Sequence, residues 1–386
     1  MSTRQDKFGF YYFDNLHFYS KLEAIQASEK HNKTLQWNFN DEVYSSYDWS
    51  IEPIESLEDL YRDRAQQIRD KYDYLILWLS GGADSANILN AFINNDIKID
   101  EVASYVNYEA TGDKYNFLNG EIYNVAIPMV EKAKEKQPWL KHTLIDLPSL
   151  TMDHFAQHGT KFDWIYHMNW YLTPNSMTRQ DIKMKIPEWA NMINSGKKVC
   201  FLHGVDKPRV TCNRNKGQYH FKFVDLIDNS VTANMQINDN PWEFDELFYW
   251  SPDAPKIPIK QGHVIKQYMK TATEYITLVE EQKKRKKYCV VSSINEEFYF
   301  LELIKLNSLI YPWHTPVMYQ VKAPSLFFTP RDEWFFKLPD SDPAKHAWRM
   351  GLDYLWNEMP DSMKSNPNKM EAGFNMMSSK SYNLGS

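Results

Sequence analysis

The segment from Ser80 to Ser85, with the sequence SGGADS, has the composition of an anion-binding loop. It contains the only adjacent glycines in a chain that has 13 glycines among 386 residues. Glycines let the backbone approach an anion closely, and serine hydroxyls add hydrogen-bond donors. A helix that begins at the loop would add unpaired N–H groups and the positive end of its dipole. These residues predict a phosphate-binding site.

The loop differs from two common nucleotide-binding motifs. No lysine follows the glycines as it does in GxxxxGK[ST], and the glycines do not have the GxGxxG spacing. Asp84 places a negative charge inside the loop, which would repel a phosphate unless a divalent cation bridges the two. The pyrophosphate end of ATP, bound with Mg²⁺, would meet this condition.

A second group of polar residues follows the buried strand expected at Val199–Leu202, in the sequence HGVDKPR from His203 to Arg209. The carboxyl ends of parallel strands share one edge of a sheet, so this turn and the Ser80 loop can face one ligand. Gly204 is then a candidate ligand contact, and Asp206 would complete a magnesium site with Asp84. Lys207 and Arg209 would neutralise negative charge on the pyrophosphate end of such a ligand. The alternative is a surface turn with solvated charges and a histidine packed near the core.

The pattern of hydrophobic residues indicates how these segments are positioned. The run from Tyr74 to Leu79 lacks alternation, as in a strand buried on both faces of a parallel sheet, and an amphipathic helix follows the loop. Strand and helix then alternate, which predicts right-handed βαβ units. The fold class is therefore expected to be α/β, a doubly wound parallel sheet with helices on both faces. The further elements expected are strands at 101–106, 143–147 and 198–203, and helices at 121–136, bent near Pro128, and 179–195.

The expected organisation has four parts. Residues 1–55 form an N-terminal flap and residues 56–210 form the α/β domain. Residues 211–360 form a mainly helical part with a short hairpin whose strands lie at 220–224 and 231–235. Residues 361–386 form a flexible tail. The helices expected after the α/β domain lie at 262–284, 295–306 and 343–358.

The SGGxDS pattern after a hydrophobic strand resembles the signature of the PP-loop ATP pyrophosphatases, of HUP/PP-loop fold type. This superfamily includes the synthetase domain of asparagine synthetase, GMP synthetase and NAD synthetase. The resemblance covers the six motif residues and the βαβ context of 56–210, and we find no family signature beyond about 210. It implies that ATP is cleaved between its α and β phosphates. A carboxylate or carbonyl oxygen is adenylated, and an amine or sulfur nucleophile then displaces AMP.

The resemblance also implies roles for individual residues. The β and γ phosphates would be held by four residues of the loop, and Mg²⁺ would be bound by Asp84. Adenine would lie between the ends of the first two strands, near Leu79, Tyr105 and Asn107. The four phosphate-holding residues are Ser80, Gly81, Gly82 and Ser85.

Composition narrows the function classes. The net charge of −6, with 24% charged and 43% hydrophobic residues, is ordinary for a soluble globular protein. The start of the sequence is polar, and we find no apolar stretch near the roughly 20 residues of a membrane-spanning helix, so we expect a cytoplasmic protein with no membrane contact. The negative charge makes nucleic-acid binding an unfavoured but open alternative.

The positions of the cysteines exclude several kinds of functional site. The three cysteines, Cys200, Cys212 and Cys289, form no CxxC pair, so neither a disulfide framework nor a four-cysteine zinc site is expected. None lies near the N-terminus, where glutamine-dependent asparagine synthetases carry their glutaminase nucleophile. The leading hypothesis is an AMP-forming ligase that uses ATP and Mg²⁺ to join a small-molecule carboxylate or carbonyl substrate to an amine donor. The alternatives are a non-catalytic nucleotide-binding or interaction protein, and a PP-loop enzyme that modifies RNA or a nucleobase.

Overall fold

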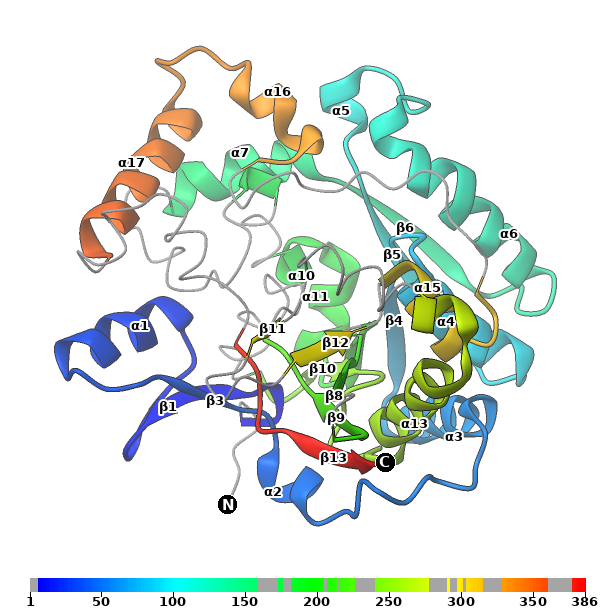
Figure 1. Ribbon diagram of the computed structural model, residues 1–386. Helices are drawn as coiled ribbons and strands as arrows, with labels where there is room; N and C mark the ends of the chain where they lie inside the picture. The colour runs from blue at the N-terminus through cyan, green and yellow to red at the C-terminus, as the bar shows by residue number, and fades with distance from the viewer. Residues whose placement is uncertain are drawn as a thin grey trace.

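The structure, a computed structural model, describes residues 6–158, 173–175, 182–204, 207–213, 216–225, 240–277, 290–291, 297–300, 303–314, 328–359 and 377–386. Its centre is a five-stranded parallel sheet in the order β10-β7-β4-β5-β6 (Figure 1). The strands are β4 (Tyr74–Trp78), β5 (Glu101–Val106), β6 (Lys141–Asp146), β7 (Val199–His203) and β10 (Glu243–Leu247).

Helices cover both faces of this sheet. Leu75 and Leu77 of β4 share a core with α3 (Leu57–Lys71) and α4 (Ala83–Asn94). Ile76, which points the other way, shares a core with α10 (Ile182–Lys185) and α11 (Pro187–Asn194). The continuous apolar run in β4 follows from burial on both sides. The expected α/β class is confirmed, and the sheet is compatible with a Rossmann-like fold.

The strand order reverses beside β4. The chain passes from β4 to β5 and β6 on one side, through α6 (Ile127–Lys134), and then crosses through α7 (Leu147–His158), α10 and α11 to β7 on the other side. The carboxyl ends of β4 and β7 are therefore adjacent. The chain leaves β4 toward one side of the sheet and reaches β7 on the other side. In open α/β sheets such a switch point is where ligands bind.

The sheet extends further than the predicted boundary at residue 210, because β10 pairs in parallel with β7. The sequence of β10 is EFDEL, and its three carboxylates do not resemble a buried strand. The predicted helix at 121–136 is also divided. A π-helical turn, η3 (Ile122–Ala126), precedes α6, because Pro128 near the start of α6 lacks an N–H and disfavours a regular helix before it.

A second, antiparallel sheet has the order β11-β12-β8-β9-β13. Its strands are β8 (Arg209–Asn213), β9 (Gln218–Lys222), β11 (Val290–Val291), β12 (Glu297–Phe300) and β13 (Tyr382–Gly385). The C-terminal part thus contains more strand than the short hairpin predicted. β9 pairs with β8 and β13, and the expected partner strand at 231–235 lies outside the described residues.

Two further expectations differ from the structure. The helix predicted at 295–306 is wrong at its start, because residues 297–300 form β12 and the helix α15 spans Leu303–Ile310. The aromatic residues of β12 favour a strand paired with β8. The last residues were expected to be flexible, yet β13 pairs with β9 and lies near α13 (Lys256–Thr271) (Figure 1). Leu384 packs against α13 at Gly262.

The N-terminal segment packs against the antiparallel sheet through aromatic rings. It contains η1 (Asp6–Phe8), β1 (Phe10–Phe13), β2 (Leu16–Phe18), α1 (Lys21–Lys30), β3 (Gln36–Asn38) and α2 (Asp41–Ser45). The ring centroid of Trp49 lies 4.8 Å from that of Phe221 in β9 and 4.4 Å from that of Tyr382 in β13. The segment predicted as a flap is therefore anchored to β9 and β13.

The remaining described elements are α5 (Tyr108–Thr111), η2 (Phe117–Asn119), η4 (Pro330–Asp332), α16 (Glu333–Phe336) and α17 (Pro343–Glu358). The last has the predicted bounds, and Asp342 caps its start by accepting hydrogen bonds from two backbone N–H groups. Among the helices of the described residues, none has the length and apolar character required to cross a membrane.

Candidate functional site

The Ser80–Ser85 loop joins β4 to α4, as the sequence predicts. The Ser80 hydroxyl oxygen accepts a hydrogen bond from the Gly82 N–H at 3.1 Å. The Ser85 hydroxyl lies 3.4 Å from that of Ser80 and donates to the Gly82 carbonyl oxygen at 3.3 Å. Gly82 precedes α4 and has no side chain to cap it, so the N–H groups of the first turn point toward the loop without a side-chain acceptor from this residue.

The glycines meet specific steric requirements. Gly81 has φ +86°, a conformation that L-residues rarely adopt, and a Cβ there would lie 2.9 Å from the Glu121 carbonyl oxygen. Gly204 follows β7, and a Cβ there would lie 3.1 Å from both the Asp84 carbonyl carbon and the Ser85 nitrogen. The turn after β7 therefore lies directly against the first turn of α4. The predicted proximity of the two loops is confirmed for Gly204.

Asp84 is the centre of the polar contacts at the site. Its Oδ2 accepts a hydrogen bond from Lys207 Nζ at 2.6 Å, and its Oδ1 accepts one from the Tyr311 hydroxyl. The side chains of Asp84 and Lys207 are about a quarter and a fifth exposed, at 25% and 19%. The Tyr249 hydroxyl donates to the Asp84 carbonyl oxygen at 2.8 Å. Segments that follow β4, β7, β10 and α15 thus converge on one residue.

The other predicted site residues have different surroundings. Arg209 is the first residue of β8, opposite Lys222, and its guanidinium makes no hydrogen bond or ion pair among the described residues. Tyr105 stacks on Trp78, with ring centroids 4.9 Å apart, on the sheet face covered by α11. Asp206 lies outside the described residues.

Asn107 lies at the carboxyl end of β5, beside β4. It is 2% exposed, and its backbone N–H donates to Asn119 Oδ1 at 3.0 Å. Its own Oδ1 is buried and has no hydrogen-bond partner among the described residues. A buried acceptor without a donor is costly, but several other buried polar atoms among the described residues share this property, so it does not by itself mark a ligand contact.

Sequence reasoning missed several residues of the site. Tyr249 follows β10, in the aromatic cluster Phe244–Trp250, which the sequence favours as core or interdomain packing over the lining of a substrate pocket. Tyr311 and His314 follow α15, where no motif marks them, and Glu121 lies beside the loop, directly before the π-helical turn η3. Burial lowers the pKa of His314, which also experiences the charges of Asp84 and Lys207.

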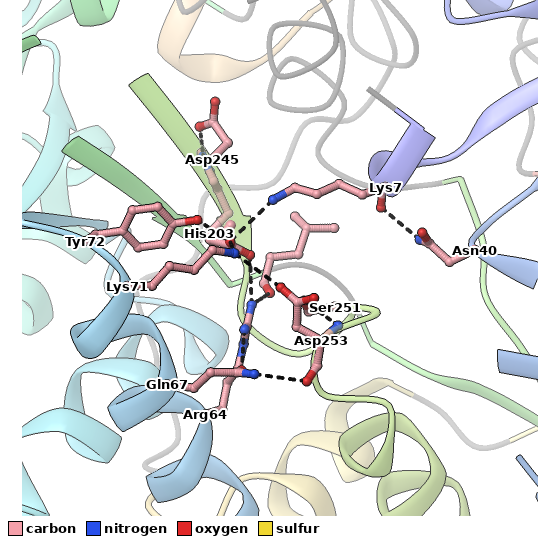
Figure 2. Close-up of polar contacts among 12 residues, drawn as sticks. Lys7, Asn40, Arg64, Gln67, Lys71, Tyr72, His203, Asp245, Ser251 and Asp253 are labelled. Carbon is pink, nitrogen blue, oxygen red and sulfur yellow. Dashed lines mark hydrogen bonds and ion pairs between the residues drawn. The ribbon is translucent and has the colours of Figure 1, made fainter. Parts of the chain in front are cut away.

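Cationic side chains pair with the buried carboxylates of β10 on both faces of the sheet. Asp245 Oδ1 lies 2.8 Å from His203 Nε2, and its Oδ2 accepts from Lys183 at 2.5 Å. Burial alone would raise the pKa of Asp245, but Lys183 and His203 outweigh it and lower the pKa to about 2. His203 is therefore a buried partner of Asp245, as Figure 2 shows.

On the opposite face, Glu246 is surrounded by cations. Its carboxylate accepts hydrogen bonds from Arg64 and Lys71, both at 2.9 Å, and from the Tyr72 hydroxyl. Figure 2 shows these three residues, which come from α3 and from the residue that directly follows it. Burial would raise the pKa of Glu246, yet Arg64, Lys7 and Lys71 hold it well below its ordinary range. These contacts anchor β10 to α3.

No protein-family model matches the chain, and no curated protein matches it either. Among the described residues, no group of three His, Cys, Asp or Glu side chains is arranged to hold a metal ion.

Proposed function

We propose that the chain is an ATP-dependent ligase of the PP-loop type, which binds ATP at the Ser80–Ser85 loop and forms AMP and pyrophosphate. One observation carries the proposal: the SGGADS loop joins β4 to α4 at the point where the strand order reverses. This is the position at which open α/β sheets bind nucleotides. The proposal assigns the chain to the doubly wound HUP/PP-loop fold type.

The residues of the loop fit a phosphate group. Ser80 and Ser85 supply hydroxyls, and the first turn of α4 supplies backbone N–H groups and a positive dipole end. A Cβ at Gly82 would lie 3.2 Å from the Ser80 hydroxyl oxygen, so glycine keeps the space above that hydroxyl open. In this proposal the loop holds the β and γ phosphates, and the nucleoside lies near the carboxyl ends of β4 and β5.

The residues also fit a magnesium ion held together with the nucleotide. Mg²⁺ in nucleotide sites commonly has one or two carboxylate ligands, phosphate oxygens and water. Asp84 would be the carboxylate, after Lys207 Nζ leaves its Oδ2. When bound, the ion would neutralise charge on the phosphate oxygens. Lys207 would then lie beside the loop, where it neutralises the departing pyrophosphate.

The proposed reaction has two steps. An oxygen of a small-molecule carboxylate or carbonyl substrate attacks the α phosphorus, and the bond from that phosphorus to the pyrophosphate oxygen breaks. An amine then attacks the activated carbon, loses a proton, and AMP departs with the electron pair of the broken C–O bond. A loop that holds the outer two phosphates leaves the α phosphorus accessible, which supports this direction of cleavage.

A non-catalytic nucleotide-binding protein is the second candidate. The contacts of Asp84 favour it, because both carboxylate oxygens already accept hydrogen bonds from protein groups, Lys207 and Tyr311. A protein that only binds nucleotide could keep these contacts, whereas a magnesium-dependent enzyme must release at least one.

Product analysis tests the proposal. Wild-type protein is incubated with MgATP and a pool of carboxylates and amines, and the nucleotides are separated by ion-exchange chromatography. We expect AMP and pyrophosphate, and Asp84→Asn should reduce their formation on the order of a thousandfold or more. Asp96→Asn is the matched control, because Asp96 is exposed at φ +55°, which asparagine tolerates. ADP and phosphate as products, or a fully active Asp84→Asn protein, would contradict the mechanism.

A further inference from the structure

A second carboxylate borders the phosphate loop. The Glu121 side chain is 10% exposed. Its Cγ lies 3.2 Å from the position that a Cβ of Gly81 would take, and its Oε1 lies 3.5 Å from the corresponding position at Gly82. Glu121 precedes the π-helical turn η3, and such turns are frequent at functional sites. An acidic group therefore lies on the side of the loop where the glycines leave room.

Arg331 pairs with this carboxylate. Its Nη2 lies 3.3 Å from Glu121 Oε2, and its Nε donates to the Leu118 carbonyl oxygen at 3.3 Å. Arg331 lies in η4, which Thr329 caps by accepting from the Arg331 N–H at 3.0 Å. The neighbouring Asp332 is fully buried and accepts from the Asn175 N–H at 2.7 Å. The turn is thus anchored, while the guanidinium side chain is 23% exposed.

The loop is consequently flanked by two ion pairs, Asp84 with Lys207 and Glu121 with Arg331. In each pair the carboxylate belongs to the loop or borders it, and a cation lies within 3.3 Å of that carboxylate. A bound phosphate would be repelled by each carboxylate and attracted by each cation, and these forces are strong where water is partly excluded. A guanidinium forms bidentate hydrogen bonds with phosphate oxygens, which suits Arg331 to this ligand.

We propose that Arg331 binds the pyrophosphate part of the nucleotide and that Glu121 holds the guanidinium beside the loop until the ligand arrives. The inference rests on the proposed nucleotide site. Arg331 exchanges the carboxylate of Glu121 for a phosphate oxygen when the nucleotide binds. Glu121 is a positioning residue that competes with the ligand for Arg331.

This competition distinguishes the proposal from a purely structural ion pair. If the pair only joins η3 to η4, removing either charge affects stability and leaves nucleotide affinity unchanged or lowers it in both cases. If Arg331 binds phosphate, the two substitutions have opposite effects on affinity. Arg331→Gln removes an attractive group, whereas Glu121→Gln removes both the repulsion and the competitor.

Isothermal titration calorimetry with α,β-methylene-ATP and MgCl₂ measures these effects in the full chain. We expect Arg331→Gln to weaken binding about tenfold or more, and Arg331→Lys to retain part of the affinity. Glu121→Gln should bind about threefold or more tightly than wild type. Arg349→Gln is the matched control, because Arg349 is a half-exposed arginine on α17 that pairs with Asp340 at 3.0 Å.

Each outcome decides between the proposals. If wild type does not bind the analogue, the proposed nucleotide site is contradicted and this inference falls with it. If wild type binds and Arg331→Gln binds equally well, the inference is overturned while the nucleotide site stands. If Arg331→Gln does not fold, Arg331→Lys takes its place: weaker binding than wild type supports the inference, and unchanged or tighter binding overturns it.

Discussion

Alanine at Gly81 and alanine at Gly82 should have very different effects on stability, although the two glycines are adjacent. Gly81 has φ +86°, where an L-residue loses about 1–2 kcal/mol. Its new Cβ would also stand 2.9 Å from the Glu121 carbonyl oxygen, and overpacking of this kind costs about 1–3 kcal/mol. We therefore expect Gly81→Ala to lower the free energy of unfolding by about 2–5 kcal/mol.

Gly82→Ala is the internal control for this estimate. Gly82 has φ −71° and ψ 164°, which alanine adopts readily, and its Cβ would meet only the Ser80 hydroxyl oxygen at 3.2 Å and Glu121 Oε1 at 3.5 Å. We expect a change below about 1 kcal/mol. Equilibrium urea unfolding, followed by tryptophan fluorescence and far-UV circular dichroism, compares the first transition of each variant with wild type. Equal midpoints for the two variants would refute the assigned loop conformation.

Three further predictions concern the buried charges and the last strand. Lys183→Met should lower the free energy of unfolding by about 3–5 kcal/mol in urea, since Asp245 then loses its buried cation; unchanged stability would contradict the buried pair. The folded-state pKa of Asp245 is about 2, below its ordinary value of about 4, so its stabilisation of about 2 kcal/mol is present at neutral pH and lost as the pH falls from about 4 to 2. Acid unfolding of Lys183→Met should therefore begin at higher pH than that of wild type, and coincident acid curves would refute this pairing. Deleting residues 382–386 exposes the edge of β9 and removes the fully buried Leu384, which should cost about 2 kcal/mol or more in urea, whereas a flexible tail would leave the midpoint unchanged.

The sequence was sufficient to predict the elements that position the loop. The run at β4 is apolar because both of its faces are covered, and such strands are recognisable without knowledge of their partners. The loop, α4, β5, β6 and β7 followed from the same alternation of strand and helix. The order of the strands in the sheet was not predictable in this way. It depends on the point at which the chain passes from one side of β4 to the other, and the alternation of strand and helix does not indicate that point.

β10 and β13 are among the strands that were missed, because long-range partners stabilise them. β10 is acidic, and its burial requires Lys183 on one face and Arg64 on the other, neither of which is near it in sequence. β13 contains few strand-forming residues and depends on pairing with β9. The contribution of Tyr311 to the site was hidden for the same reason, since its hydroxyl reaches Asp84 across the fold.

The most direct test of the nucleotide site is the thermal unfolding midpoint with and without a non-hydrolysable MgATP analogue, in wild type and Gly82→Val. Binding to the native state adds about 2.7 kcal/mol of stability at a hundredfold excess over Kd. Valine at Gly82 would fill the space beside the Ser80 hydroxyl oxygen, 3.2 Å from its Cβ. We predict a rise in the midpoint for wild type and none for Gly82→Val. The same rise in both proteins, or none in wild type, would contradict phosphate binding at the Ser80–Ser85 loop.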